Sequence, residues 1–176
     1  MEYETLTNNV PQVPSNLYLT NPDDIKQLDT MASIRRPTDP VPSWESGTVY
    51  TMYQAPDELV SWVQTHFDFP VKVTYQLITG QVPIHKDVGR TKCWNYIIDA
   101  GGDDVVTRWW NDDKTKVIRA FVFPTDCWYE LNVGINHDVA NVTGTRIAIT
   151  VWVDVDKRKR LFRDHYLHNS GSHFLT

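Results

Sequence analysis

Between residues 71 and 153 the sequence repeats one pattern, in which a short run of apolar and β-branched residues is followed by a cluster of turn residues. Such runs favour β-strands, because branched and aromatic side chains pack well on a pleated surface. Gly, Pro, Asn and Asp separate the runs and predict turns. Many short strands at this spacing indicate a mainly β sandwich or barrel. The predicted strands are 71–78, 82–87, 93–98, 105–110, 117–123, 128–133 and 146–153.

The N-terminal part of the chain lacks this pattern. Residues 1–45 contain six prolines and no sustained hydrophobic period, which predicts an irregular arm with a short helix near 23–31. The folded domain is then expected over 46–176. Within it, a helix is predicted over 56–67, because Pro and acidic residues at its start suit a first helical turn. A last helix is predicted over 154–166.

Composition excludes several classes of partner. The net charge of -5 argues against nucleic-acid binding, which requires a basic surface to neutralise phosphates. The basic run at 157–160 follows two aspartates and is interpreted as a solvated face. The N-terminus is acidic and polar, unlike a signal peptide, and no apolar run approaches the ~18 residues of a membrane span. We therefore expect a cytoplasmic protein without nucleic-acid or membrane partners, and the sequence leaves a homodimer open.

Two His-x-Asp triplets offer candidate metal ligands, namely His66 with Asp68 and His85 with Asp87. His66 ends the predicted helix, where residues two apart do not face each other and where a histidine suits the helix dipole. His85 and Asp87 end a predicted strand, where residues two apart point to the same side. Imidazole and carboxylate would converge there, so the second pair is preferred.

A third ligand is needed, because two histidines and one carboxylate on one face of the metal form the ligand set of non-haem Fe(II) oxygenases. His137 follows one apolar strand and precedes another, although a hydrogen-bonded turn histidine is the alternative. The remaining histidines, His165, His168 and His173, lie in a polar tail. His137 is therefore the candidate.

Arg146 opens a strongly apolar strand. Burying its charge without a partner would be costly, so an anionic partner is expected, and a dicarboxylate would suit the guanidinium fork. The alternative is a strand-end arginine in water.

These residues together resemble the Fe(II)/2-oxoglutarate-dependent oxygenases. In the segment 75–87, Gly80 follows Tyr75 by five residues, and the His-x-Asp triplet begins five residues after Gly80. This segment looks like their first iron-binding strand region. His137, 50 residues after Asp87, and Arg146, nine residues later, resemble their distal histidine and the basic residue that binds 2-oxoglutarate. Further positions are similar to the aspartyl/asparaginyl-hydroxylase-like branch, including phage and marine bacterial relatives: Arg90, Asn95, Trp109, Trp110 and Asn141.

The resemblance implies a double-stranded β-helix of the jelly-roll or cupin-like kind, with the N-terminal arm and flanking helices around it. It implies Fe(II) bound by the catalytic residues His85, Asp87 and His137, and 2-oxoglutarate held by Arg146. Tyr75 and Asn95 become candidates for further contacts to 2-oxoglutarate. The alternatives are that Tyr75 is a core tyrosine and that Asn95 is a strand asparagine whose hydrogen bonds are satisfied within the sheet.

The implied reaction couples O₂ and 2-oxoglutarate to hydroxylation of an unactivated C–H bond, with release of succinate and CO₂. The expected substrate is a small molecule or peptide, with an acidic or amide-bearing amino-acid side chain. Arg90 could contact the co-substrate, receive a substrate carboxylate or tie down the loop after Asp87. Trp109 and Trp110 must face opposite sides of a strand, so one could line the barrel mouth, unless both are ordinary core residues.

Two other classes remain open on the sequence. A cupin-type metal enzyme that does not use 2-oxoglutarate would need the three ligands but no Arg146. A non-catalytic binding or virion-associated jelly-roll module would need neither the three metal ligands nor Arg146.

Overall fold

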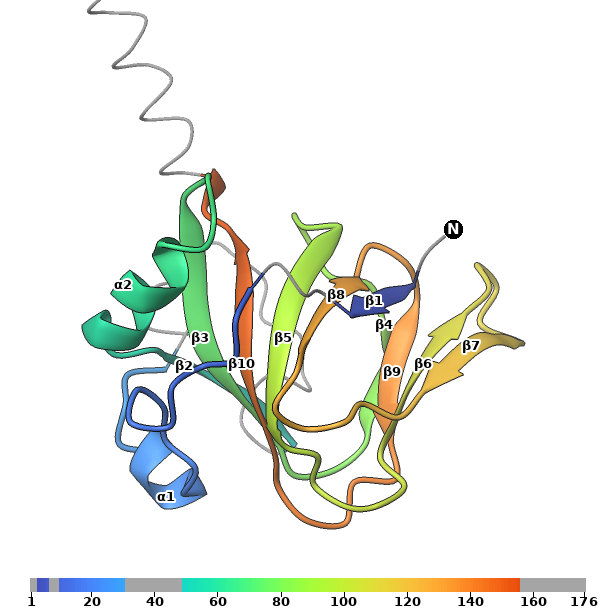
Figure 1. Ribbon diagram of the computed structural model, residues 1–176. Coiled ribbons are helices and arrows are strands. Elements are labelled where there is room, and N and C mark those ends of the chain that lie inside the picture. Colours follow the sequence, from blue (N-terminus) through green and yellow to red (C-terminus); the bar gives the residue numbers. More distant parts are fainter. Residues whose placement is uncertain (1–2, 7–9, 31–48, 156–176) are drawn as a thin grey trace, which may run out of the picture.

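Two antiparallel β-sheets face each other in the computed structural model, which describes residues 3–6, 10–30 and 49–155 (Figure 1). The larger sheet has the strand order β1-β8-β5-β10-β3-β2, and the smaller sheet has the order β4-β9-β6-β7. The strands are β1 (Glu4–Leu6), β2 (Tyr50–Gln54), β3 (Val71–Ile78), β4 (Val82–His85), β5 (Lys92–Asp99), β6 (Val106–Trp110), β7 (Val117–Phe121), β8 (Trp128–Asn132), β9 (His137–Ala140) and β10 (Arg146–Val153).

The order in which the chain visits the two sheets defines the fold. From β3 onward it runs to β4 in the smaller sheet, β5 in the larger, the β6–β7 hairpin in the smaller, β8 in the larger, β9 in the smaller and β10 in the larger. Eight antiparallel strands that cross between two sheets in this way form a double-stranded β-helix, or jelly roll. The predicted fold class is confirmed, and β1 and β2 extend the larger sheet at its two edges.

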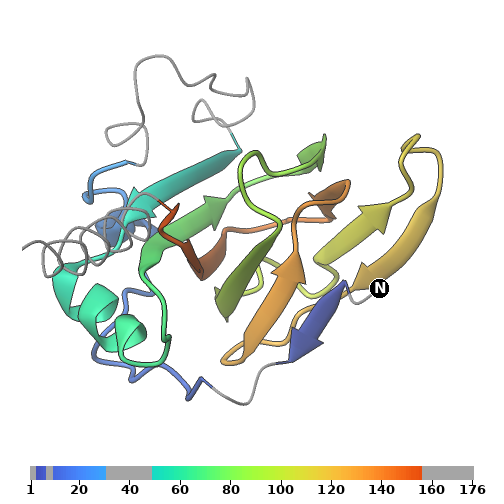
Figure 2. The ribbon, with the colours of Figure 1, turned by 90° about the horizontal axis from the view of Figure 1, so that it is seen from above.

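The outer face of the larger sheet is covered by the N-terminal segment and two helices. These are α1 (Pro22–Ile25) and α2 (Asp57–Gln64). Ile25, Leu59 and Val63 are fully buried against this face, where they pack in one cluster with Tyr75 and Ile149. Figure 2 shows α2 on the side of the molecule away from the β6–β7 hairpin. The central strands of the larger sheet are therefore covered on both faces, which explains why the first six residues of β10 are all buried.

Most predicted strands are present in the structure. β3 and β10 have the predicted bounds, and the other five predicted strands differ from β4 to β8 by at most two residues at either end. The strands β1, β2 and β9 were not predicted. β9 consists of four buried residues that include His137 and Asp138, so it lacks the alternation of apolar and polar residues that signals a half-buried strand. β1 is three residues long, within the segment predicted as an irregular arm.

Both predicted helices that lie in the described residues are shorter than expected. α1 begins at Pro22, capped by the Asn21 side chain, and ends at Ile25 rather than at residue 31. α2 ends at Gln64 rather than at residue 67, because the Gln64 amide donates to the Phe69 carbonyl and accepts from the Val71 N–H. Neither helix is long and apolar enough to cross a membrane, within the part of the chain that the structure describes. Apart from its first two residues, the predicted helix at 154–166 lies outside the described residues, as does the basic run.

Candidate metal centre

Two neighbouring strands of the smaller sheet bring the predicted metal ligands together. His85 ends β4, His137 opens β9, and the two residues are register partners. Asp87 lies just beyond β4, where its backbone N–H donates to the Val133 carbonyl at 3.0 Å. Among the described residues, His85, Asp87 and His137 form the one group of His, Cys, Asp or Glu whose ligand atoms all lie within 4.8 Å of one another. The structure therefore contains a cluster that could hold a metal ion.

The three side chains point toward a common centre. Nε2 of His85 lies 3.4 Å from Oδ1 of Asp87, and Nε2 of His137 lies 3.9 Å from the same oxygen. The two imidazole centroids are 4.3 Å apart. All three side chains are largely buried, with 10–14% of each exposed.

The hydrogen bonds of the two imidazole rings fix which nitrogen faces this centre. Nδ1 of His85 contacts the Pro83 carbonyl at 2.7 Å, and Nδ1 of His137 contacts the Ile135 carbonyl at 2.9 Å. A carbonyl oxygen only accepts hydrogen bonds, so each Nδ1 carries a proton and donates it. Nε2 of each ring is then the nitrogen that faces Asp87 and is available to a metal, which is how metal-binding histidines are usually oriented.

The cluster is electrostatically suited to a cation. Burial alone would raise the pKa of Asp87, but the hydrogen bond with His85 and the charge of Arg90 outweigh burial and lower the pKa to about 2. Burial lowers the pKa of His137 to about 4, and the neighbouring His85 acts in the same direction. At neutral pH the cluster therefore has an ionised carboxylate and a neutral His137, the forms that bind metals.

The cluster lies in the wall of a cavity between the two sheets. The lining of this cavity includes all three cluster residues. The other polar lining residues come largely from the larger sheet and the loop after β4: Tyr50, Gln76, Arg90, Cys93, Asn95, Thr107, Arg146 and Thr150. Apolar lining residues are Ile78, Val82, Trp109, Leu131, Val133 and Val139.

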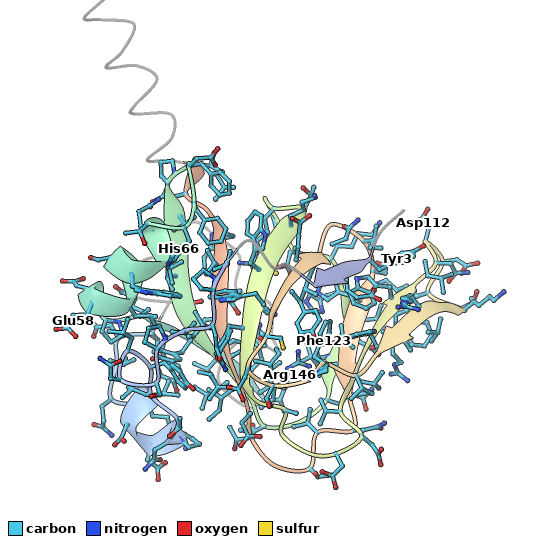
Figure 3. The ribbon with its side chains drawn as sticks, in the orientation of Figure 1. Tyr3, Glu58, His66, Asp112, Phe123 and Arg146 are labelled. Atoms are coloured by element: carbon cyan, nitrogen blue, oxygen red, sulfur yellow. The ribbon has the colours of Figure 1, made fainter. Side chains whose placement is uncertain are left out.

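Arg146 reaches this cavity from the first position of β10 and is only 3% exposed, which contradicts the alternative of a strand-end arginine in water. Its Nη1 donates to the Thr107 hydroxyl at 3.3 Å, and its guanidinium lies 5.6 Å from the centre of the Phe123 ring. Nε is buried without a hydrogen-bond partner. Figure 3 shows Arg146 and Phe123 close together between the sheets.

No carboxylate forms an ion pair with Arg146 among the residues that the structure describes. Burial accordingly lowers the pKa of Arg146 to about 10. Burying a charged guanidinium without an anionic partner costs free energy, and an anion in the cavity would offset that cost.

The structure does not bring Tyr75 to the cavity, which corrects the expectation that it contacts a co-substrate. Its side chain is completely buried on the outer face of the larger sheet, where its hydroxyl accepts a hydrogen bond from the Leu19 N–H at 2.8 Å. The neighbouring Gln76 lines the cavity instead, because successive residues of a strand point to opposite faces. The alternative of a core tyrosine describes its position.

Asn95 does line the cavity, and the structure adds a residue beside it that the sequence analysis missed. Thr150 of β10 is the register partner of Asn95 and lines the same cavity. Its hydroxyl oxygen is buried and has no hydrogen-bond partner. The available signal was its place four residues after Arg146, which puts both side chains on one face of β10.

Arg90 is bound to a cluster residue rather than free for a substrate. Its Nε donates to Oδ2 of Asp87 at 2.5 Å. The structure therefore favours the alternative in which Arg90 ties down the loop after Asp87.

The tryptophans divide between the faces as strand geometry requires. Trp109 is buried in the cavity wall and donates to the Asn132 carbonyl at 2.8 Å. Trp110 points away from the cavity, where the Arg108 guanidinium lies 5.1 Å from its ring centre. Trp94 and Trp128 belong to the cluster on the outer face of the larger sheet. Trp110 is thus not a cavity residue, which corrects its expected substrate contact.

The other His-x-Asp triplet, which begins at His66, lies away from the cluster. His66 packs edge-on against Trp62 of α2, with ring centroids 4.5 Å apart. Figure 3 shows His66 beside α2, on the opposite side of the larger sheet from Arg146. His66 is therefore separated from the cluster by a full sheet.

The fold and the cluster together define the class of this chain as a jelly roll of cupin-like form with a candidate metal centre. No protein-family model and no curated protein sequence matches the chain. Its structure is similar to that of Bacillus subtilis oxalate decarboxylase with Mn(II) centres, with a TM-score of 0.45, 10% identity, and coverage of 74% of this chain and 29% of that one. A variant of the same enzyme gives a TM-score of 0.42 and 12% identity, with coverage of 66% and 28%. Procruciferin, an 11S globulin of Brassica napus, gives 0.40 and 7%, with coverage of 61% and 25%. The chain spans less than a third of the length of these three structures.

Proposed function

We propose that this chain is an Fe(II)- and 2-oxoglutarate-dependent oxygenase that hydroxylates an unactivated C–H bond. The observation that carries the proposal is Arg146, a buried cation without an anionic partner among the described residues, in the same cavity as the His85, Asp87 and His137 cluster. A metal site alone would not require this arginine. A dicarboxylate that binds the metal at one end and Arg146 at the other would use both.

The cluster fits Fe(II) by its donor types. Two imidazole nitrogens and one carboxylate oxygen on one side of an ion leave positions open toward the cavity, as in non-haem Fe(II) oxygenases. When bound, iron would activate O₂ for C–H oxidation while 2-oxoglutarate is converted to succinate and CO₂. His85 and His137 would bind through Nε2 and Asp87 through Oδ1, the atoms that already face one another.

The larger sheet supplies the groups that would bind the co-substrate. Arg146 offers a guanidinium fork to the distal carboxylate, and the Thr107 hydroxyl lies beside it. The Thr150 hydroxyl and the Asn95 amide offer neutral hydrogen bonds on the same wall. The apolar lining, including Trp109 and Leu131, limits the access of water to the reacting groups.

The cavity favours a neutral group on the substrate. Arg146 is assigned to 2-oxoglutarate and Arg90 is paired with Asp87, so the described lining offers no further arginine or lysine for a substrate carboxylate. Gln76, which lines the cavity and is not assigned to the co-substrate, can instead hydrogen-bond to an amide or hydroxyl. We therefore propose an amide-bearing amino-acid side chain, free or in a peptide, in preference to an acidic one.

A second candidate is a cupin-type metal enzyme that acts on a small carboxylate without 2-oxoglutarate. One observation favours it, namely that Arg146 already contacts Thr107 and Phe123 within the chain. These contacts give Arg146 some stabilisation without a co-substrate.

An anaerobic titration with Fe(II), with and without 2-oxoglutarate, separates the candidates. The proposal expects a metal-to-ligand charge-transfer band that requires both components and disappears in the His137→Ala variant. Fe(II) binding without such a band would favour the second candidate. If the chain bound no divalent ion, both candidates would be excluded, and a non-catalytic jelly-roll module would be the remaining class. His66→Ala is the matched control, because His66 lies outside the cavity and should not affect the band.

A further inference from the structure

Arg90 makes two contacts that connect the metal cluster to the larger sheet. It lies in the loop between β4 and β5, and its Nε donates to Oδ2 of Asp87 at 2.5 Å. Its guanidinium also lies 4.5 Å from the ring centre of Trp152, which is near the end of β10. Both charged side chains are largely buried, with 20% of Arg90 and 11% of Asp87 exposed. The contact is therefore sheltered from competing water.

The two oxygens of Asp87 consequently face different partners. Oδ1 faces Nε2 of both histidines, whereas Oδ2 faces Arg90. A carboxylate with two unengaged oxygens can bind a metal through one or both of them. Because Oδ2 is held by a charge-assisted hydrogen bond, Oδ1 is the atom presented to the centre of the cluster.

Trp152 restricts how Arg90 can move. An aromatic face attracts a guanidinium, and stacking fixes the plane of the group and therefore the direction of its N–H bonds. Since Trp152 comes from the larger sheet and Asp87 follows a strand of the smaller one, this contact holds the carboxylate from the facing sheet.

We propose that Arg90 is a positioning residue that limits Asp87 to one-oxygen coordination of the metal, and that Trp152 holds Arg90 in the orientation this requires. Three protein atoms then occupy one face of the ion. Two-oxygen binding by Asp87 would occupy a fourth position and leave fewer for a chelating co-substrate and O₂. This inference rests on the metal site of the proposed function.

A purely electrostatic role for Arg90 predicts the opposite effect of removing it. Arg90 is a positive charge next to a cation site, so deleting that charge alone should strengthen the binding of a divalent ion. Loss of the positioning contact should weaken binding and change the coordination of the ion. The sign of the change in affinity therefore separates the two roles.

Co(II) is a suitable probe, because its visible absorption reports its coordination number. The metal-free full chain and its variants are titrated with Co(II), and dissociation constants are measured by competition with a chromophoric chelator. Arg90→Met keeps the aliphatic stem, and we expect a changed Co(II) spectrum and roughly 10- to 100-fold weaker binding, as for other residues that orient metal ligands. Arg90→Lys keeps the charge but not the fork, so its spectrum should be intermediate.

Arg108→Met is the matched control. Arg108 also pairs with an aspartate, because it donates two hydrogen bonds to Asp138, which is adjacent to His137 in sequence, but neither residue lines the cavity. Its Co(II) spectrum and affinity should equal those of the unmodified chain.

Several outcomes would overturn the inference. An Arg90→Met variant that has the unmodified spectrum and equal or tighter Co(II) binding would show that Arg90 only adjusts charge. Should Arg90→Met fail to fold, Trp152→Leu is measured in its place. An unchanged Co(II) spectrum in Trp152→Leu would also contradict the inference. Failure of the unmodified chain to bind Co(II) would remove the metal site itself, and with it both the proposed function and this inference.

Discussion

Replacing Arg146 by methionine tests whether this buried cation exists for a ligand. Burial lowers the pKa of Arg146 from 12.5 to about 10, so the charged form is disfavoured in the folded state by about 3 kcal/mol at neutral pH. Because the folded pKa lies below the unfolded one, this destabilisation is present at every pH below about 10 and is relieved only above it.

The expected effect on the ligand-free chain is a gain in stability. Methionine removes the buried charge and also removes the hydrogen bond to Thr107, which contributes roughly 1 kcal/mol. The free energy of unfolding of Arg146→Met should therefore exceed that of the unmodified chain by about 1–2 kcal/mol. Urea unfolding in the presence of a chelator measures this difference.

Ligand binding should change in the opposite direction. Losing the cation that pairs with a buried carboxylate should weaken 2-oxoglutarate binding by roughly 2–5 kcal/mol, while metal affinity stays nearly the same. Calorimetric titration of the Mn(II)-loaded chain with 2-oxoglutarate measures this. Arg146→Lys should recover part of the loss, because it restores the charge without the fork. A variant that is less stable than the unmodified chain and binds 2-oxoglutarate equally well would refute the reasoning, since Arg146 would then be a structural residue.

Three further perturbations have distinct expected outcomes. Thr150→Val removes a buried hydroxyl without a partner, so calorimetry should show weaker 2-oxoglutarate binding while urea unfolding shows no loss of stability. Tyr75→Phe should lower the free energy of unfolding by roughly 1 kcal/mol through the lost Leu19 bond and leave 2-oxoglutarate affinity unchanged. The His137 pKa of about 4 lies below its ordinary value of 6.5, so the unfolded chain takes up the proton first. Urea unfolding of the metal-free chain should show stability falling from pH 6.5 toward 4, less steeply in His137→Gln.

The sequence was most informative where one local pattern determines one structural property. The alternation of strands and turns predicted a mainly β sandwich or barrel, because each signal is contained within a few residues, whereas the double-stranded β-helix was implied by the family resemblance. The pair His85 and Asp87 could be preferred over His66 and Asp68 because helix and strand geometry place residues two apart differently. The structure brings the preferred pair together with His137, although Asp87 lies beyond the end of β4 and is held there by the Val133 carbonyl.

Properties that depend on distant partners were not predictable. Strand alternation places Tyr75 and Gln76 on opposite sides of β3, but the side that forms the cavity is set by which face α2 and the N-terminal segment cover. The engagement of Arg90 depends on Trp152, which is far along the chain. Thr150 was overlooked because a threonine in an apolar strand is ordinary until its hydroxyl is found to lack a partner.

The position of β4 links the cluster to local unfolding. β4 is a four-residue strand at the edge of the smaller sheet, and its neighbour within the described sheet is β9. A short edge strand with one hydrogen-bonded neighbour separates from its sheet more easily than an interior strand. A metal bound by His85 and His137 would crosslink β4 to β9 at the positions where they pair. Loading the ion would then slow hydrogen exchange of β4 amides selectively, and the metal-free chain would be more open to proteolysis at this edge than the metal-bound chain.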